Sequence, residues 1–368
     1  MLSSEVVVVR RVVLVVAGLV LAGCSPTVGG AGMPLPGHPV DVESLRVTGT
    51  QPVAAEGAMR LSPDGTRLLH LGDMCVTALD GSQRKCVDRD KAHPDIQRAE
   101  WSPDGKHLVF TDDFWRLLLE PDVWVFDIES GELRNLTDDG VDKYDLFEPD
   151  PDAKVDVLPS WSPDGGTIRF ARGGAAKDDR MHLMTVAADG GDVHILREVD
   201  CATPQLVALA WTTGRVAWAC GNQGPEVMAA SITGGDPDTL MAGKEGEDRM
   251  LLSFSPDGES LLVDSMASYS AYDQTGGGMA RVVPAGGGDP VRVADGKVGY
   301  PTWAPDGDAI AYVEMPGKLK VVAEPGGEPR ELRSADRFAA SDGMRLSWAP
   351  GKILVYEDGD TTFLTLEE

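Results

Sequence analysis

The residues that could carry out chemistry in this chain are few and widely spaced. None of the six histidines forms a His-x-x-x-His or His-Glu-x-x-His pair, so the sequence gives little support to a zinc site. No Gly-x-Ser-x-Gly pentapeptide is present, which argues against a serine hydrolase of the α/β type. The glycine clusters lack the strand–loop–helix context of a phosphate-binding loop. These patterns predict a protein that is not an enzyme and that needs no cofactor.

The densest group of oxygen ligands lies in the segment 138–156, which contains eight carboxylates. Calcium prefers hard oxygen ligands, and the candidate ligands are Asp138, Asp139, Asp142 and Asp145. The Asp-x-Asp-x-Asp-Gly spacing of an EF-hand loop is absent. A solvated acidic loop is therefore the default interpretation of this segment, and a Ca²⁺ site is the alternative.

The charge balance excludes several kinds of partner. Against 33 Lys and Arg stand 59 Asp and Glu, which gives a formal net charge of −26. A nucleic-acid partner needs a basic face for its phosphates, and docking onto anionic lipid needs the same, so both are disfavoured. The 42% hydrophobic content suffices for a substantial core, while 43 Gly and 25 Pro favour a turn-rich, all-β chain.

The N-terminal segment predicts export and lipidation. An apolar run over 12–22 is too short to span a bilayer, which takes about 20 residues, but it suits a signal peptide. The small residues before Cys24 resemble a bacterial lipobox. We therefore expect a signal peptide over 1–23, lipidation of Cys24, and a flexible tether over 24–40 that holds the rest at the outer face of the bacterial cell membrane. An ordinary signal peptide is the alternative.

One motif recurs along the chain at intervals of 40 to 60 residues. In its full form it is an aromatic residue or Leu, followed by Ser or Ala and then Pro-Asp-Gly. Five full copies and two degenerate ones begin at Leu61, Trp101, Trp161, Trp211, Phe254, Trp303 and Trp348. Proline presets φ, aspartate bonds the backbone ahead, and glycine takes the left-handed conformation, so the motif predicts a hairpin turn rather than a metal site.

A second set of Gly-rich turns, such as Asp80-Gly81 and Gly234-Gly235, lies between the motif copies. Each repeat is thus predicted to be four antiparallel strands, which we letter A to D from the centre outward, and this is typical of a propeller blade. The last repeat lacks one strand, which the segment 42–47 can supply, and such closure removes exposed edges. We predict an all-β propeller of seven blades over 41–368, with six blades as the alternative.

These Trp-Ser-Pro-Asp-Gly repeats and Gly-Gly turns resemble the WD40-like repeats of TolB-type propellers. Similar blades form the propeller domain of prolyl-oligopeptidase-type peptidases. The resemblance covers most of 41–368 and implies the fold, because the motif residues are structural. The small α/β domain that precedes the TolB propeller has no counterpart after Cys24, so a role in a Tol system is not expected.

Four cysteines follow the lipobox, and export would place them where disulfides persist. Two of them lie at equal distances on either side of the Asp80-Gly81 turn, so they should face each other across strands C and D of the first blade. The other two lie at the same end of strands A and B of the fourth blade. The expected disulfides are Cys75–Cys86 and Cys201–Cys220. Four independent buried thiols are the alternative.

The long connections predict a binding surface. A–B and C–D turns emerge on one face of a propeller, and B–C and D–A loops emerge on the other. All long connections belong to the second face: 112–122, 138–156 and 265–278. In the first of them, Phe114, Trp115 and Arg116 are the candidate partner-binding residues, because aromatic and Arg side chains dominate interface hot spots. A local cap over the second blade is the alternative role.

The function expected from these features is that of a non-catalytic lipoprotein. Its propeller would bind a protein, peptide or envelope polymer on the B–C/D–A face, and the acidic loop there favours a basic partner. One alternative is a propeller enzyme of lyase, glycosidase or quinoprotein type with a site at the central channel, and another is a sensory or accessory module of an envelope complex. Just before the motif's aromatic residue, the inner strands carry only Arg60 and Glu100 as charges. A cluster of titratable side chains at the channel mouth would instead favour an enzyme.

Overall fold

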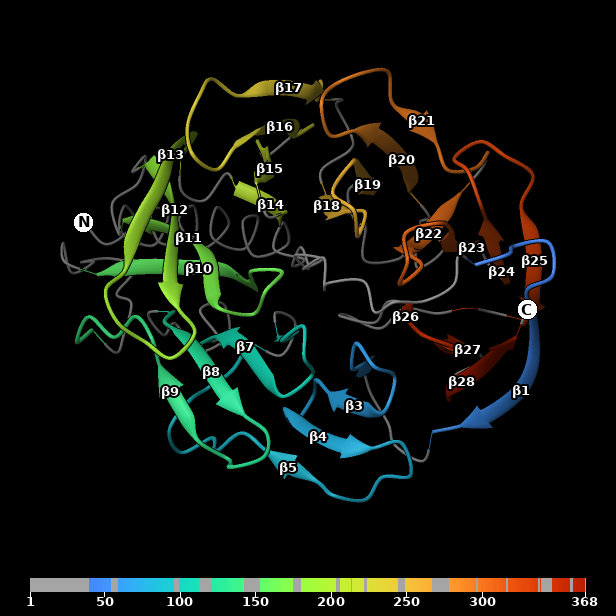
Figure 1. Cartoon of the computed structure of the whole chain (residues 1–368), viewed down its shortest axis with the longest axis horizontal. Helices are drawn as coiled ribbons and strands as arrows, with labels where there is room; N and C mark the ends of the chain where they lie inside the picture. The colour runs from blue at the N-terminus through green and yellow to red at the C-terminus, as the bar shows by residue number, and fades with distance from the viewer. Residues whose placement is uncertain are drawn as a thin grey trace, which may run out of the picture.

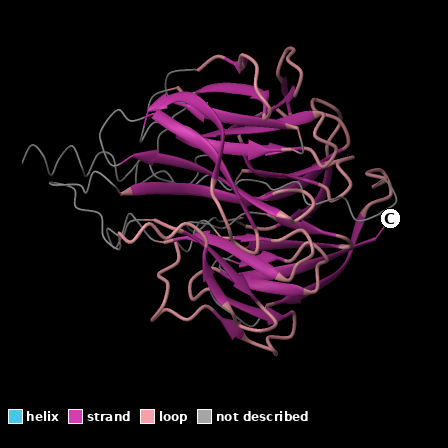
Figure 2. Cartoon of the chain, turned by 60° about the vertical axis from the view of Figure 1, so that its left-hand side comes forward, coloured by secondary structure: helices cyan, strands magenta, loops and turns pink. Residues whose placement is uncertain are grey.

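The described part of the chain consists of strands and loops, without helices (Figure 2). It therefore contains no helix that could cross a membrane. The computed structural model describes residues 40–53, 59–95, 99–112, 121–141, 153–174, 180–202, 206–212, 214–221, 224–243, 249–266, 278–295, 297–315, 317–336, 338, 346–357 and 360–367.

Seven four-stranded antiparallel sheets are arranged as the blades of a propeller (Figure 1). In blades 1 to 6 the strands follow one another in sequence order, from the inner strand A to the outer strand D. Both the predicted all-β class and the predicted number of blades are confirmed, and the six-bladed alternative is excluded. The repeat was a reliable guide because each copy of the motif closes the A–B hairpin of one blade.

The first four blades occupy the chain up to Met241. Blade 1 contains β2 (Met59–Leu61), β3 (Arg67–His70), β4 (Cys75–Ala78) and β5 (Lys85–Cys86). Blade 2 contains β6 (Glu100–Trp101), β7 (His107–Thr111), β8 (Val123–Asp127) and β9 (Leu133–Asn135). Blade 3 contains β10 (Lys154–Trp161), β11 (Thr167–Gly174), β12 (Arg180–Ala187) and β13 (His194–Ala202). Blade 4 contains β14 (Leu206–Trp211), β15 (Arg215–Cys220), β16 (Glu226–Ser231) and β17 (Asp238–Met241).

The other three blades complete the ring. Blade 5 contains β18 (Arg249–Phe254), β19 (Ser260–Met266), β20 (Met279–Pro284) and β21 (Val291–Arg292). Blade 6 contains β22 (Val298–Trp303), β23 (Ile310–Glu314), β24 (Lys318–Val322) and β25 (Arg330–Ser334). Blade 7 contains β26 (Ser347–Ala349), β27 (Lys352–Glu357), β28 (Asp360–Glu367) and, as its outer strand, β1 (Arg46–Pro52).

The ring closes by strand exchange between the two ends of the propeller. Strand β1 pairs antiparallel with β28, from Arg46 opposite Glu367 to Pro52 opposite Thr362. The prediction that an N-terminal strand completes blade 7 is therefore confirmed, but the segment 42–47 was the wrong choice of strand. Its first residues form a turn, in which Leu45 donates its N–H to the carbonyl of Asp41. The apolar pattern that suggested a strand serves the core instead.

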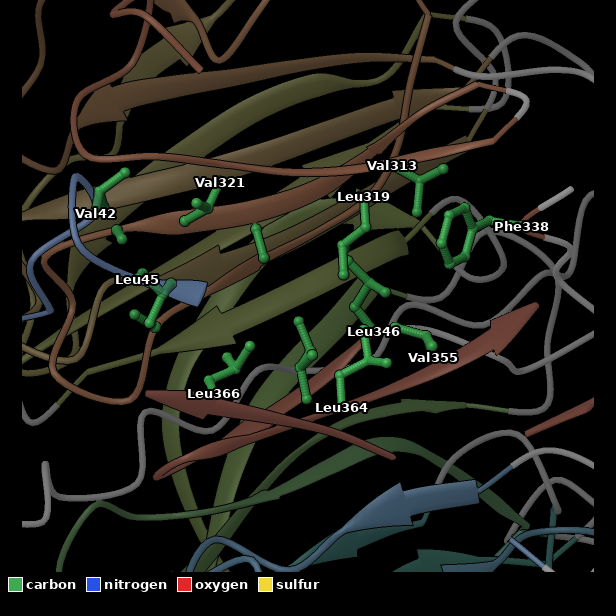
Figure 3. Close-up of a cluster of buried hydrophobic side chains, with 14 residues drawn as sticks. Val42, Leu45, Val313, Leu319, Val321, Phe338, Leu346, Val355, Leu364 and Leu366 are labelled. Carbon is green, nitrogen blue, oxygen red and sulfur yellow. The ribbon is translucent and has the colours of Figure 1, made fainter. Parts of the chain in front are cut away.

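The core lies mainly between neighbouring blades. The cluster between blades 6 and 7 combines Val321 of β24 with Leu364 of β28, and it also takes in Val42 and Leu45 from the N-terminal turn (Figure 3). Burial of such side chains contributes about 25 cal/mol per Å² of apolar surface. Because neighbouring blades bury each other's faces, no single blade has a complete core.

The motif has the turn geometry that its residues predict. In blade 2, Gly105 donates its N–H to the carbonyl of Ser102 at 2.9 Å and adopts a φ of 68°. The hydroxyl of Ser102 donates to Oδ1 of Asp104 at 2.6 Å, and the same oxygen accepts the N–H of Lys106 at 3.1 Å. The motif aspartate is thus held by its own turn, which agrees with a structural role.

Both predicted cysteine pairs are confirmed. Cys75 and Cys86 are bonded across β4 and β5, where they are direct partners in the sheet register. Cys201 of β13 and Cys220 of β15 are also bonded, with their Cα atoms 5.8 Å apart. The second disulfide joins blade 3 to blade 4, because Cys201 belongs to the outer strand of blade 3 rather than to the beginning of blade 4.

Candidate functional site

The two faces of the propeller carry different kinds of connections between strands. We call the face with the B–C and D–A connections the loop-rich face, and the face with the A–B and C–D turns the turn face. Several predicted site residues lie outside the described residues: Cys24, Phe114, Trp115, Arg116, Asp142 and Asp145. The predicted signal peptide and all of the tether except Val40 also lie outside them. The predictions for these residues stay predictions.

Four carboxylates gather at the loop-rich end of the junction between blades 2 and 3. Asp112 follows β7, Asp122 precedes β8, Asp139 follows β9, and Asp156 lies on the inner strand β10. We call these four residues the aspartate cluster. The charges of Asp112 and Asp156 act on Asp122, and the charge of Asp139 acts on Asp156, so the four interact electrostatically. The chain therefore concentrates titratable groups at one place.

Asp122 lies at the centre of this cluster. Its side chain accepts hydrogen bonds from Asn135 Nδ2 at 2.7 Å and from Thr137 Oγ1 at 3.2 Å, and the residue is 8% exposed. Burial, reinforced by the charges of Asp156 and Asp112, raises the pKa of Asp122 to about 6. A carboxyl group with such a pKa can hold a proton near neutral pH and release it readily.

Asp156 is fully buried and paired. Arg172, its register partner on β11, donates from Nε to Oδ1 at 2.7 Å and from Nη2 to Oδ2 at 2.6 Å. Burial outweighs this bidentate pair and raises the pKa of Asp156 to about 6, and the charge of Asp139 acts in the same direction. The backbone N–H of Asp156 also donates to the carbonyl of Pro121 at 3.1 Å, which ties blade 3 to the beginning of β8.

The remaining two members differ in how well they are bonded. Asp112 accepts the N–H of His93 at 2.9 Å and Nε1 of Trp124 at 2.5 Å, and burial raises its pKa nevertheless. Asp139 accepts the N–H of Val141 at Oδ1, while its Oδ2 is buried and has no hydrogen-bond partner among the described residues.

The described residues do not fit a metal. Among them, no group of three or more His, Cys, Asp or Glu side chains is arranged to hold an ion. The carboxylates of Asp112, Asp122 and Asp156 already accept hydrogen bonds from protein donors. Asp138, one of the two described candidates for calcium, caps its own loop by accepting the N–H of Gly140 at 2.9 Å.

Further buried or partly buried charges lie in blades 1, 2 and 5, outside the aspartate cluster. Arg60 of β2 donates from Nη1 to the carbonyl of Ala99 at 2.6 Å and lies near Glu100 and Asp95, both 8% exposed. Burial lowers the pKa of Arg60, and the two carboxylates counteract it. On blade 5, Asp264 is 3% exposed near the end of β19, and Arg281 of β20 donates to Ser265 Oγ at 3.1 Å.

The sequence held one signal for the cluster that was missed. Asp156 lies five residues before the aromatic residue of its motif, where the corresponding residues of blades 4 and 6 are Leu206 and Val298. A charged residue inside an otherwise apolar inner strand is a candidate functional residue. Asp112 and Asp122 gave no comparable signal, because aspartate is common at strand ends and turns.

Comparison with known proteins shows the fold. No family model matches the chain, and no curated protein matches it by sequence. An oligogalacturonate lyase in complex with manganese is similar at 13% identity, with a TM-score of 0.60, over 88% of this chain and 95% of the lyase. An oligogalacturonate lyase from Vibrio parahaemolyticus is similar at 11% identity, with a TM-score of 0.58, over 88% of this chain and 91% of the lyase.

Other propellers are similar to comparable degrees. The β-propeller domain of Cps50 (Swd1) from Myceliophteria thermophila matches at 12% identity, with a TM-score of 0.53, over 86% of this chain and 99% of that domain. A putative TolB from Agrobacterium tumefaciens matches at 16% identity over 84% of this chain and 99% of the other, but its TM-score of 0.43 carries no argument. The neighbours thus include a WD40-type and a TolB-like propeller, and at these identities the likeness shows the fold alone.

The expected non-catalytic function is contradicted by these findings. Similar structures include two oligogalacturonate lyases, which are enzymes built on a propeller. The described residues also include a cluster of titratable groups, which lies at the loop-rich end of the junction between blades 2 and 3. The prediction failed because charges were counted at one position of each inner strand, while the aspartate cluster gathers residues from strand ends and from the interior of β10.

Proposed function

We propose that this protein is a propeller enzyme that cleaves a glycosidic bond in an oligosaccharide or polysaccharide, with the aspartate cluster as its acid–base centre. The proposal rests mainly on Asp122 and Asp156, two interacting carboxyl groups whose pKa values are both raised to about 6. Groups with pKa values near the working pH are the most effective at transferring protons.

Asp122 is the proposed proton donor. In hydrolysis, water adds to the anomeric carbon as the glycosidic bond breaks, and the departing oxygen takes its proton from a carboxylic acid with a raised pKa. The proton that the water releases restores that acid. Asp122 is the better candidate because it is 8% exposed, whereas Asp156 is fully buried against Arg172. The negative charge of Asp156 raises the pKa of Asp122, so its proposed role is to keep the donor protonated.

One observation supports a carbohydrate substrate, and a second indicates which charge that substrate carries. The oligogalacturonate lyases are propellers of similar size that act on an oligosaccharide. The net charge of −26 and the four carboxylates of the cluster would repel a polyuronate, so a neutral or amino sugar is the better electrostatic match. We therefore propose hydrolysis of a glycosidic bond in a neutral or amino sugar, because elimination requires a uronic carboxylate next to the carbon that loses its proton.

The test is an assay against neutral, amino and uronic oligosaccharides. New reducing ends report cleavage, and ultraviolet absorbance of an unsaturated product separates elimination from hydrolysis. We expect cleavage by the wild type and a loss of about 10²-fold or more in Asp122→Asn, the usual effect of removing a general acid. The matched control is Asp192→Asn in the exposed turn after β12, which should keep full activity. Absence of cleavage throughout, or full activity of Asp122→Asn, would contradict the proposal.

We also propose that the enzyme works outside the cell on a lipid anchor. The support is the lipobox-like segment that ends at Cys24 and the two disulfides, which persist in oxidising compartments. Replacing Cys24 with Ala should move the protein from the membrane fraction to the soluble exported fraction and abolish uptake of labelled fatty acid. Membrane retention of the variant, together with an unlabelled wild type, would contradict the anchor.

A further inference from the structure

A cavity lies at the end of the same blade junction that is opposite the aspartate cluster. Between blades 2 and 3, on the turn face, the described residues enclose a groove of about 620 Å³. Cavities of roughly 300–1,000 Å³ are typical of small-molecule sites. Strand β8 connects the two places, because Asp122 precedes it at the loop-rich face and Asp127 ends it in the groove. We call this cavity the turn-face groove.

The groove has an excess of negative charge. Its carboxylates are Asp104, Asp127, Glu132, Asp164 and Asp189. Arg134 is its one guanidinium group, and it is already engaged: Nη2 donates to Glu132 at 3.0 Å, and Nη1 donates to the carbonyl of Ala188 at 3.4 Å. Lys106 Nζ also lies 3.9 Å from Oδ2 of Asp104. The carboxylates still outnumber the lysine and arginine groups that contact them, and this excess attracts a cation from solvent.

An aromatic wall stands next to these carboxylates. Trp161 lines the groove and packs against the ring of His107, with centroids 5.9 Å apart. Trp161 is 4% exposed, and its indole Nε1 has no hydrogen-bond partner among the described residues. The motif residues Trp101 and Trp211 likewise have a buried Nε1 without a partner among the described residues, whereas Trp303 gives its Nε1–H to the carbonyl of Ser253 at 3.1 Å. Indole rings beside carboxylates provide the combination that binds organic cations.

One pair in the groove departs from the propeller repeat. His107 and Asp127 are register partners across β7 and β8, and Nε2 of His107 lies 3.3 Å from Oδ2 of Asp127. The same register position holds Thr167 opposite Ala187 in blade 3, and Ser260 opposite Pro284 in blade 5. The hairpin therefore does not require a histidine and an aspartate here, which indicates a local role.

We propose that the turn-face groove binds an organic cation, namely an ammonium or guanidinium group on an apolar stem. The charged end pairs with Asp127 and Asp104, and the stem packs against Trp161 and Pro163 at the blade junction. This site is separate from the proposed catalytic centre and does not depend on it. A free amine and an Arg or Lys side chain of a peptide share the chemistry that the groove recognises.

The experiment measures binding of N-acetyl-arginine amide to the purified protein by calorimetry, with the neutral N-acetyl-citrulline amide as the matched probe. We expect the guanidinium compound to bind, the citrulline compound to bind at least about 10-fold more weakly, and added salt to weaken the first only. The indole N–H resonance of Trp161 should shift on binding. Equal binding of the two probes, or no binding of either, would overturn the proposal.

Two variants locate the binding site. Asp127→Asn keeps the oxygen that accepts the N–H of Ser130 at 2.8 Å but removes the charge, and it should weaken binding about 10-fold or more. Asp192→Asn removes one exposed charge from outside the groove and should leave binding unchanged. Equal losses in both variants would show that net charge alone attracts the probe, and that would refute the site.

A last measurement distinguishes a free cation from the side chain of a peptide as the ligand. An Arg-centred tripeptide with blocked ends carries the same group within a peptide backbone. Tighter binding of the tripeptide than of N-acetyl-arginine amide would assign the groove to peptide side chains, and weaker binding would assign it to free cations. Either ranking supports the groove as a cation site, provided that Asp127→Asn weakens both.

Discussion

The two ends of strand β8 carry the same residue type with opposite acid–base behaviour. At the loop-rich end, burial beside other carboxylates raises the pKa of Asp122 to about 6. At the turn end, a hydrogen bond from the backbone N–H of Ser130 is the main cause that lowers the pKa of Asp127. The motif aspartate Asp164 behaves like Asp127, because the hydroxyl of Ser162 and the N–H of Gly166 stabilise its charged form.

The two kinds of aspartate have different roles in this repeat protein: one kind stabilises turns, and the other is proposed to carry out acid–base chemistry. Aspartates that the turns of the blades use are exposed or partly exposed and satisfied by those turns, so they are ionised and poorly suited to transfer protons near neutral pH. Aspartates at the loop-rich end of blades 2 and 3 are buried next to one another, so their ionisation costs free energy. Repeated residues build the propeller, and the departures from the repeat carry the candidate functions.

The largest effect should come from breaking the buried ion pair of the cluster. Arg172→Met leaves Asp156 buried without its cation, and loss of one partner of a buried pair typically costs about 3–5 kcal/mol. The double variant Arg172→Met with Asp156→Leu should recover much of that stability, because both charges are then absent. Urea unfolding measures the stability of the single and the double variant relative to the wild type. A single variant that costs less than about 1 kcal/mol would show that Asp156 keeps its proton at neutral pH.

A smaller effect should appear in the pH dependence of stability. The folded pKa of Asp122, about 6, lies above the ordinary value of 3.8, so the folded state holds a proton that the unfolded chain has released. This contribution favours folding below about pH 4 and is lost as the pH rises through 6. As the pH rises from 4 to 7, the free energy of unfolding of Asp122→Asn should therefore increase relative to that of the wild type, by up to about 3 kcal/mol.

The control for this pH series is Asp164, an aspartate of the repeated motif. The pKa of Asp164 is lowered in the folded state, so its contribution is present above the ordinary value and is lost as the pH falls below it. Asp164→Asn should show no gain between pH 4 and 7 in the same unfolding series. A parallel gain in both variants would mean that overall negative charge, rather than burial, sets the trend.

The smallest effect is expected in the turns. Asp164→Ala removes the acceptor of the Ser162 hydroxyl at 2.6 Å and of the Gly166 N–H at 3.0 Å. Because Gly166 is exposed, its N–H can bond to water, while the buried Ser162 hydroxyl loses its acceptor. We therefore expect a cost of about 1 kcal/mol in thermal or urea unfolding. A cost as large as that of Arg172→Met would contradict the division between the two kinds of aspartate.

Local chemistry made much of the fold predictable. Pro-Asp-Gly turns, the spacing of their copies and the Gly-rich turns between them predicted the blades, because a hairpin turn depends on a few adjacent residues. Cys75 and Cys86 could be paired because the turn fixes their register. The strand that closes blade 7 was placed too early in the chain, since the apolar residues Val42 and Leu45 pack as a turn onto the core.

The sequence by itself determined the repeat, the number of blades and the cysteine pairs, while the tertiary structure decided where acid–base chemistry is possible. Asp122 and Asp156 belong to different blades. Burial and the charges of Asp156 and Asp112 raise the pKa of Asp122, and burial and the charge of Asp139 raise the pKa of Asp156. Desolvation and electrostatic coupling depend on distances in space between residues that are remote in the chain. For that reason the residue types alone predicted a binding protein, whereas the enzyme proposed above rests on carboxyl groups that only the fold brings together.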